Sequence, residues 1–187
     1  KVMGLASYGE PTYIEEFRRM VSPGSKGTFK LGLDYFLHAS LGVNMAWDNT
    51  EPRIDRAYSD FMCRRLGPAR EPGDEVTDRH KNIAASLQAV LQEIYYHVLN
   101  YAYDAIGKKS LALAGGVAFN SVANGGIYAN TPFEDVYIQA AAGDAGTALG
   151  AACYLNHQVL GQPRVFEMNT AFWGPGFDEK HYVESLE

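Results

Sequence analysis

The hydrophobic pattern is strongest across residues 80–108, where apolar side chains recur every three or four positions. This spacing places them along one face of a helix, which buries that face against a core. Thr77 or Asp78 can cap the start of this helix by accepting backbone N–H hydrogen bonds. Gly107 suits its end, because glycine adopts the left-handed conformation found there. The apolar stripe consists of Ile83, Leu87, Val90, Leu91, Ile94, Val98, Tyr101, Ala102, Ala105 and Ile106.

Three shorter segments precede the long helix. Residues 13–20 have apolar positions at helical spacing and predict a short amphipathic helix. Residues 28–36 alternate apolar and polar side chains, which predicts a half-buried strand. Residues 54–66 predict another short helix, and the two prolines of residues 67–73 then make a stiff turn. The side chains expected to face inward are Ile14, Phe17, Met20, Phe29, Leu31, Leu33, Tyr58, Phe61, Met62 and Leu66.

After the long helix, strands and helices alternate. We expect strands at residues 110–114 and 135–139, and helices at about residues 118–129 and 146–159, with a glycine-rich turn after each strand. Strands that alternate with helices through short turns imply right-handed crossovers and a mainly parallel sheet. The sequence therefore predicts an α/β fold with flanking helices, and a loop-rich tail from Pro163 onward.

Composition narrows the class of protein. The chain has 187 residues, 47% of them hydrophobic, which is enough to bury the core of one domain or most of one. A net charge of −6 argues against a nucleic-acid partner. No apolar run approaches the ~20 residues of a membrane-spanning helix, so no membrane partner is expected. Cys63 and Cys153 form no spacing motif and are interpreted as reduced thiols of a cytoplasmic protein.

The turn after the strand expected at residues 110–114 contains Gly115 and Gly116. Glycines let the backbone approach a ligand closely, and the helix that follows directs free N–H groups back toward the turn. This arrangement is suited to phosphate, and the side-chain amide of Asn120 can add a further contact. A tight strand–helix turn without a ligand is the alternative, which the glycine pair alone does not exclude.

The second turn strengthens the phosphate hypothesis, because Gly143 and Gly146 flank a single acid, Asp144. An aspartate just before a helix is a good N-cap. It can also be a carboxylate ligand of a metal ion that bridges nucleotide phosphates. The spacing leaves both roles open. Arg70 can clamp an anion or pair with a neighbouring acid, and the five histidines include no helical metal-site pair.

Six short motifs follow one another along the chain, at residues 3–9 (MGLASYG), 67–72 (GPAREP), 83–88 (IAASLQ), 113–120 (LAGGVAFN), 124–125 (NG) and 143–152 (GDAGTALGAA). In these motifs and in their order, the sequence resembles the O-carbamoyltransferases of the nodulation-factor and antibiotic type. The resemblance extends over nearly the whole chain.

The resemblance implies a two-domain parent protein. Its first domain is similar to the universal tRNA threonylcarbamoyl-adenosine synthesis protein and has the actin/Hsp70/sugar-kinase (ribonuclease H-like) type of ATPase fold. Its second domain has the YrdC fold. The resemblance also implies a reaction in which carbamoyl phosphate and ATP give a carbamoyl-adenylate, whose carbamoyl group passes to a hydroxyl of a sugar or antibiotic-like acceptor. The acceptor and the oligomeric state stay open, and an oligomer is compatible with the sequence.

The family motifs assign roles to particular residues of this sequence. They imply that the nucleotide is bound by Gly115, Gly116, Val117, Asn120, Gly143 and Gly146. They also imply that Asp144 is a ligand of a divalent metal, iron or magnesium. No catalytic residue is assigned by this resemblance.

The sequence also departs from the family. The family's other metal ligands, a His-x-x-x-His pair, and the YrdC-like domain have no counterpart here, and alanines 140–142 replace a common proline. We therefore interpret residues 1–187 as a single partial domain, the second lobe of the ATPase-like domain, with residues 186–187 as a cloning remnant. Alone it should be inactive. The alternatives are another ATP-dependent phosphotransferase of the same fold, or a non-catalytic interaction module.

Overall fold

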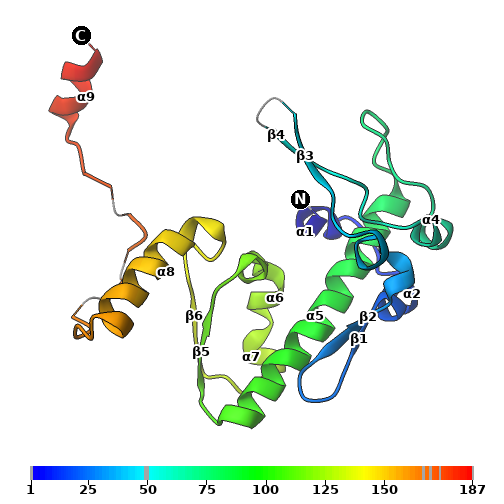
Figure 1. Ribbon diagram of the computed structural model, residues 1–187, viewed down its shortest axis with the longest axis horizontal. Helices are drawn as coiled ribbons and strands as arrows, with labels where there is room; N and C mark the ends of the chain where they lie inside the picture. Colours follow the sequence, from blue (N-terminus) through cyan, green and yellow to red (C-terminus); the bar gives the residue numbers. More distant parts are fainter. Residues whose placement is uncertain (1, 49–50, 166, 169, 173, 187) are drawn as a thin grey trace. The chain divides into compact units, whose positions relative to one another are not determined.

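The computed structural model describes residues 2–48, 51–165, 167–168, 170–172 and 174–186 (Figure 1). Contacts within the chain divide it into two compact units. The first unit comprises residues 1–111 and 120–136, and the second comprises residues 112–119 and 137–187. The chain thus leaves the first unit after residue 111, returns to it at residue 120, and leaves it again after residue 136.

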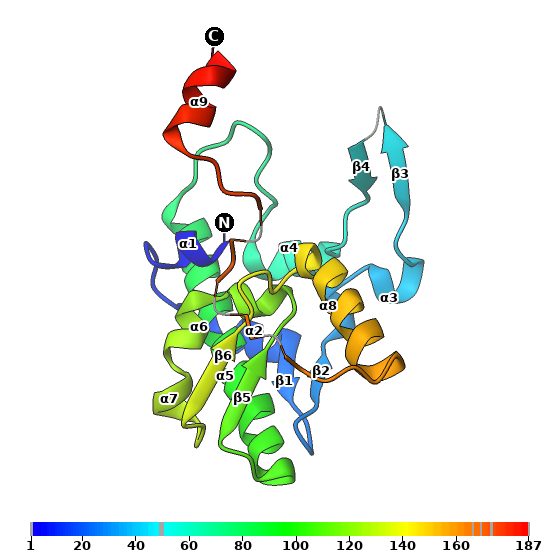
Figure 2. The same cartoon turned by 90° about the vertical axis from the view of Figure 1, so that its left-hand side faces the viewer.

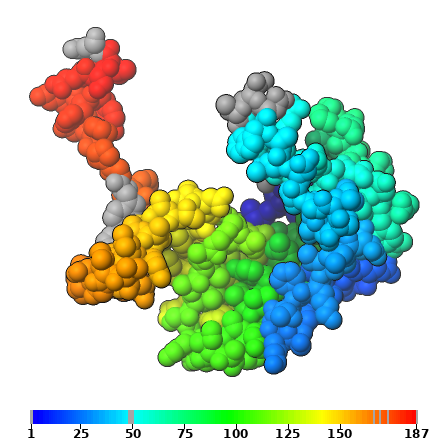
Figure 3. All heavy atoms as spheres, viewed as in Figure 1, coloured from blue at the N-terminus to red at the C-terminus, as the bar shows by residue number. Residues whose placement is uncertain are grey.

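The first unit is built around α5 (Asp78–Ile106), the long helix predicted from the hydrophobic stripe. Helices α1 (Val2–Ala6) and α2 (Ile14–Met20) pack against it, and α3 (His38–Leu41) and α4 (Asp60–Leu66) precede it in the chain. In the space-filling view, blue residues that precede α5 in the chain border the green of α5 (Figure 3). The buried side chains at the centre of the first unit are Phe17, Met20, Tyr35, Leu66 and Val90.

Both ends of α5 have the local chemistry expected from the sequence. At the start, Thr77 and His80 form a reciprocal capping box, which satisfies backbone N–H groups that the helix leaves free. At the end, Gly107 adopts φ 68° and its N–H donates to the carbonyl of Tyr103 at 2.7 Å. The left-handed conformation is unstrained for glycine, so the helix stops there. The predicted helix and the Thr77 cap are therefore confirmed.

The antiparallel strands are shorter and more exposed than the sequence predicts. Strands β1 (Val21–Pro23) and β2 (Phe29–Leu31) form one hairpin, and β3 (Met45–Asp48) and β4 (Glu51–Ile54) form another. The prediction of one half-buried strand at 28–36 is wrong, because β2 is exposed throughout and the chain then turns into a 3₁₀ helix at Leu33–Tyr35. The helix expected from residue 54 begins six residues later, after β4.

Strands β5 (Ser110–Leu113) and β6 (Asp135–Ile138) lie side by side (Figure 2). The carbonyl of Lys109 accepts from Asp135 N–H at 3.2 Å, and the carbonyl of Leu113 accepts from Gln139 N–H at 3.1 Å. Since the partners advance together, this pair is parallel. The mainly parallel sheet needs correction, however: the described strands form three separate pairs, and two of them are antiparallel.

The helix predicted between these strands is divided into pieces: a 3₁₀ helix at Gly116–Phe119, then α6 (Ser121–Gly125) and α7 (Ile127–Asn130). After β6, a 3₁₀ turn at Asp144–Gly146 leads into α8 (Thr147–Tyr154), which continues as a π-helical turn to Val159. The structure is thus a mixed α/β arrangement. The tail contains an eight-residue helix, α9 (Glu179–Leu186), and Glu187 lies outside the described residues.

Two further sequence predictions concern the environment of the protein. Cys63 and Cys153 are free thiols, as expected. Among the described residues, none of the helices has the length and apolar character required to cross a membrane. A cytoplasmic location stays a prediction.

Candidate phosphate-binding cavity

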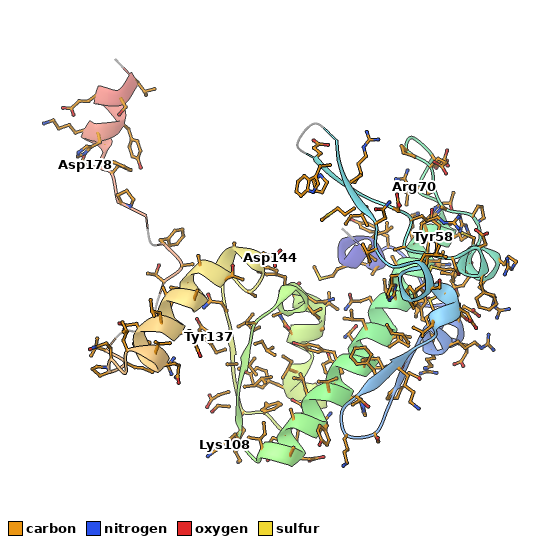
Figure 4. The ribbon with its side chains drawn as sticks, viewed as in Figure 1. Tyr58, Arg70, Lys108, Tyr137, Asp144 and Asp178 are labelled. Atoms are coloured by element: carbon orange, nitrogen blue, oxygen red, sulfur yellow. The ribbon has the colours of Figure 1, made fainter. Side chains whose placement is uncertain are left out.

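The second unit contains a cavity of about 910 Å³ between the ends of β5 and β6 and one face of α8. Gly115 and Gly116 line it from the first glycine turn, and Gly143, Asp144 and Gly146 line it from the second. Figure 4 shows Asp144 in the turn that leads into α8. The structure therefore gathers five of the predicted site residues around one space.

The two glycine turns are joined directly. The N–H of Gly115 donates to the carbonyl of Ala142 at 2.7 Å, so the first residue of one turn is held by the middle of the other. Gly115 has φ 100°, a conformation that side chains with a Cβ rarely adopt. The carbonyl of Gly115 then accepts from Ala118 N–H at 3.0 Å, which starts the 3₁₀ helix. This position requires glycine for its backbone, with or without a ligand.

The second turn is tightly folded on itself. A Cβ on Gly146 would lie 2.0 Å from the carbonyl oxygen of Ala141, so a side chain there cannot be accommodated without moving the backbone. The side-chain oxygen of Gln139 accepts from Ala141 N–H at 3.2 Å and supports the same turn. The hydroxyl of Thr147 donates to the carbonyl of Asp144 at 2.7 Å. The path of the backbone from the end of β6 to the start of α8 is thus well determined.

The carboxylate of Asp144 is exposed at the cavity. It does not act as an N-cap, because the capping position before the 3₁₀ turn is Gly143 and no side chain caps it. In the part of the chain that the structure describes, none of the hydrogen bonds or ion pairs uses this carboxylate. Its oxygens are therefore available to a ligand.

The donor set decides which kind of metal ion could fit. No group of three His, Cys, Asp or Glu side chains able to hold a metal lies among the described residues. The described residues therefore offer no cage of protein ligands for a metal ion. A magnesium ion does fit, because magnesium is commonly held by one or two carboxylates together with phosphate oxygens and water.

Two predicted residues are not at the cavity. Val117 lies in the 3₁₀ helix and is 55% exposed, but it is not part of the cavity wall. Asn120 belongs to the first unit, where its side-chain oxygen accepts from Ala123 N–H at 3.0 Å and caps α6. The same amide is hydrogen-bonded to Gln88 of α5. Contacts of these two residues with a nucleotide stay predictions.

Several cavity residues were not predicted from the sequence. On α8 and its extension, Cys153 and His157 line the cavity below Gly146 and Gly150, at spacings that share one helix face. That periodicity was visible in the sequence, but it does not tell which face of a helix borders a cavity. The other unpredicted lining residues with polar side chains are Tyr137, Gln139, Thr147, Arg164 and Glu167.

Arg70 belongs to the first unit, in the loop after α4, and it is not among the residues that line this cavity (Figure 4). Its guanidinium donates to the backbone carbonyl of Asp74 at 2.7 Å and to that of Glu71 at 3.3 Å. The neighbouring acid was the expected partner, and the contact is instead with backbone oxygens. Arg70 therefore stabilises its own loop, beside a smaller cavity of about 210 Å³ in the first unit.

Two glycine turns joined at one cavity within an α/β chain are typical of proteins that bind phosphorylated ligands. The sequence model of the family described as Carbamoyltransferase N-terminus matches residues 1–153. The chain belongs to this family.

Three curated relatives extend the comparison. The Synechocystis protein sll1178, which is uncharacterised, is 37% identical across 100% of this chain and 29% of its own length. Nodulation protein NolNO of Sinorhizobium fredii is 34% identical across 98% of this chain and 24% of its own length. Nodulation protein NolO of Bradyrhizobium diazoefficiens is 33% identical across 98% of this chain and 30% of its own length. The chain thus spans less than a third of each of these relatives.

Proposed function

We propose that this chain is part of an ATP-dependent O-carbamoyltransferase and that its cavity binds the phosphates of ATP. The observation that carries the proposal is the hydrogen bond between Gly115 and Ala142, which holds both glycine turns at one cavity. Membership of the carbamoyltransferase family supplies the reaction class. The family match supports the transfer of a carbamoyl group, and the cavity with its two glycine turns supports the binding of phosphates.

The backbone provides the phosphate contacts in this proposal. The 3₁₀ turn Asp144–Gly146 leads directly into α8, and Asp144, Gly146 and Thr147 all line the cavity. The N–H of Thr147 donates to the carbonyl of Asp144, so the N–H groups at the start of this helical segment lie in the turn before Thr147. The positive end of the helix dipole lies at the same place and favours an anion. With a net charge of −6, the chain depends on such backbone groups rather than on a surface rich in lysine and arginine.

Asp144 would hold a divalent ion against those phosphates, because its carboxylate is exposed at the cavity and is used by no other described contact. The bound ion would neutralise phosphate charge during the reaction. The role of the chain itself is to present one carboxylate at a fixed point of the second turn. Magnesium suits this donor set, and any further protein ligand would come from outside this sequence.

The reaction that we assign to the full-length protein joins carbamoyl phosphate and ATP into a carbamoyl-adenylate and then transfers the carbamoyl group to a hydroxyl. Water first releases inorganic phosphate from carbamoyl phosphate and leaves carbamate. The carbamate oxygen attacks the α-phosphate of ATP, pyrophosphate leaves and the adenylate forms, and AMP leaves when the hydroxyl is carbamoylated. The acceptor is a sugar or an antibiotic-like molecule, and its selection is assigned to regions beyond these 187 residues. We place the reaction in the cytoplasm, where ATP is available.

Product analysis on the full-length protein tests this proposal. The protein is incubated with carbamoyl phosphate, ATP, magnesium and candidate acceptors, and the nucleotide products are separated. We expect AMP and pyrophosphate, with at least tenfold slower formation in Asp144→Ala and an unchanged rate in the control Asp104→Ala, an exposed carboxylate on α5. ADP as the main product would instead indicate a phosphotransferase. Equal rates in all three proteins would overturn the role of Asp144.

A further inference from the structure

Gln88 is a polar residue in the buried face of α5, with only 9% of its surface exposed. It ends the motif at residues 83–88, to which the cavity gives no role. A buried amide without hydrogen-bond partners would destabilise the fold, so the partners of Gln88 indicate its structural role. The preceding motif residue Ser86 is fully buried and accepts from Tyr13 N–H at 2.8 Å, which ties the N-terminal segment to α5. Gln88 makes a different connection.

The amide of Gln88 pairs reciprocally with the amide of Asn120. The Gln88 nitrogen donates to the Asn120 oxygen at 3.1 Å, and the Asn120 nitrogen donates to the Gln88 oxygen at 2.9 Å. Two hydrogen bonds between planar amides fix both side chains in orientation as well as in distance. A second hydrogen bond joins the same two helices, because Tyr95 of α5 donates to Asn124 of α6 at 2.9 Å. We call these contacts between α5 and α6 the polar seam.

The pair determines what the Asn120 side chain can do. Its oxygen accepts from both Gln88 and the backbone N–H of Ala123, and one of its two N–H groups is donated to Gln88. An amide has two donors and an oxygen with two lone pairs, so one N–H is left for any further contact. Asn120 is therefore bound mainly within the protein, at the start of α6.

Asn120 also lies where the chain re-enters the first unit after the Gly115–Gly116 turn. The intervening Ala118 is 4% exposed, and its N–H is bonded to the carbonyl of Gly115 at 3.0 Å. Only residues 117–119 separate Gly116 from Asn120 in the sequence. The hydrogen bonds that anchor Asn120 therefore hold the segment by which the chain leaves the glycine turn.

We propose that Gln88 is a positioning residue for the nucleotide cavity, which acts by holding Asn120 and with it the exit of the Gly115–Gly116 turn. The inference rests on the proposed ATP site. It gives the motif at residues 83–88 a function at that site, although Gln88 does not line the cavity. Small displacements of a binding loop by a distant substitution can weaken a site by an order of magnitude or more.

The test is a calorimetric titration of the full-length protein with magnesium and a non-hydrolysable ATP analogue. Gln88→Met keeps the side-chain volume and removes the amide pair. Asn120→Ser removes the same pair but keeps a good N-cap residue for α6. We expect each substitution to weaken binding by roughly tenfold, and the double variant to bind about as well as either single variant, because both break one interaction. Tyr95→Phe is the control, since it removes a hydrogen bond of the same seam without touching Asn120.

The control separates positioning from general stability. Urea unfolding is measured on every variant, and Tyr95→Phe should lower stability while leaving analogue binding unchanged. Wild-type affinity in Gln88→Met would overturn the inference, as would losses that add in the double variant. Asn120→Ser with weak binding and Gln88→Met with normal binding would assign Asn120 to direct contact, which also overturns it. If Gln88→Met does not fold, Gln88→Leu takes its place, and normal analogue binding in that variant contradicts the proposal.

Failure of the proposed function gives a different pattern. In that case the wild-type protein itself shows no magnesium-dependent binding of the analogue, and Asp144→Ala matches it. A wild-type protein that binds the analogue and loses this binding in Asp144→Ala retains the proposed site. The Gln88 variants then report on positioning alone.

Discussion

A buried carboxylate in the first unit gives a prediction whose magnitude follows from the structure. Glu16 of α2 is 8% exposed, and Arg65 of α4 donates to both of its oxygens, at 2.7 and 2.6 Å. Tyr35 donates at 2.5 Å and Arg19 at 2.9 Å. The hydrogen bonds from Arg65 lower the pKa of Glu16 from 4.5 to about 2, although burial raises it. The group therefore stabilises the fold in its ionised form.

The size of that stabilisation has an upper bound. The difference between a pKa of 4.5 and one of about 2, at about 1.36 kcal/mol per pH unit, gives about 3 kcal/mol. The side chains of Arg65 and Arg19 are 42% and 61% exposed, so water and salt screen part of this interaction. We therefore expect Glu16→Gln to lower the free energy of unfolding by about 1–2 kcal/mol at pH 7. The NH₂ group of the introduced glutamine would also face the guanidinium groups of Arg65 and Arg19, which need hydrogen-bond acceptors.

The pH dependence has a defined direction. Because the folded-state pKa lies below the ordinary value, the stabilisation is complete above pH 4.5 and is lost as the pH falls toward 2. The difference in the free energy of unfolding between wild type and Glu16→Gln should thus narrow when urea unfolding is repeated at about pH 3.5. Glu15→Gln is the matched control, since Glu15 is the preceding residue and its side chain is 77% exposed beside Arg18.

Two results would refute this reasoning. The first is a loss of stability in Glu15→Gln as large as that in Glu16→Gln. The second is a difference between wild type and Glu16→Gln that stays constant from pH 7 to pH 3.5. Either result would mean that the negative charge of Glu16 does not stabilise the fold through its hydrogen bonds with Arg65, Tyr35 and Arg19.

Three further predictions concern the cavity and the chain as a whole. Gly115→Ala should lower the free energy of unfolding by about 1–3 kcal/mol, because the φ of Gly115 is 100°. Gly116 has an ordinary φ and open space around it, so Gly116→Ala should unfold like wild type. If the cavity binds ATP, the added methyl of Gly116→Ala should nevertheless weaken analogue binding in calorimetry. Gly146→Ala should destabilise the protein in urea more than Gly150→Ala, since its Cβ would lie 2.0 Å from a backbone oxygen while position 150 is open. The 187-residue chain alone should show no carbamoyl transfer in a radiolabel assay, and robust ATP-dependent transfer by it would contradict the partial-site interpretation.

The sequence predicted those elements best whose signals are local. Helix α5 has a long 3.6-residue period, a capping box at Thr77 and a glycine at its end, and all three act through neighbouring residues. The expected strand at 28–36 shows the opposite case. Its alternating pattern is real, but burial of one face needs a covering layer, and β2 has all of its residues exposed. Alternation alone cannot say whether such a layer exists.

The candidate site divides in the same way. Glycine turns after strands are local features, and Gly115, Gly116, Gly143, Asp144 and Gly146 indeed border one cavity. The partnership of Gln88 with Asn120 joins residues 32 positions apart, so no local pattern could reveal it. The contribution of Cys153 and His157 depends on the rotation of α8, which the helix alone does not determine. Local sequence patterns therefore predict the glycine turns, but not the contacts between residues far apart in the chain.

The most direct test of the central claim is a crystal structure of the full-length protein with magnesium and a non-hydrolysable ATP analogue. The account predicts phosphate density against the turns at Gly115–Gly116 and Gly143–Gly146, with the metal ion in contact with the Asp144 carboxylate. An analogue bound with its phosphates away from both turns, or a metal ion that leaves Asp144 without contact, would contradict it.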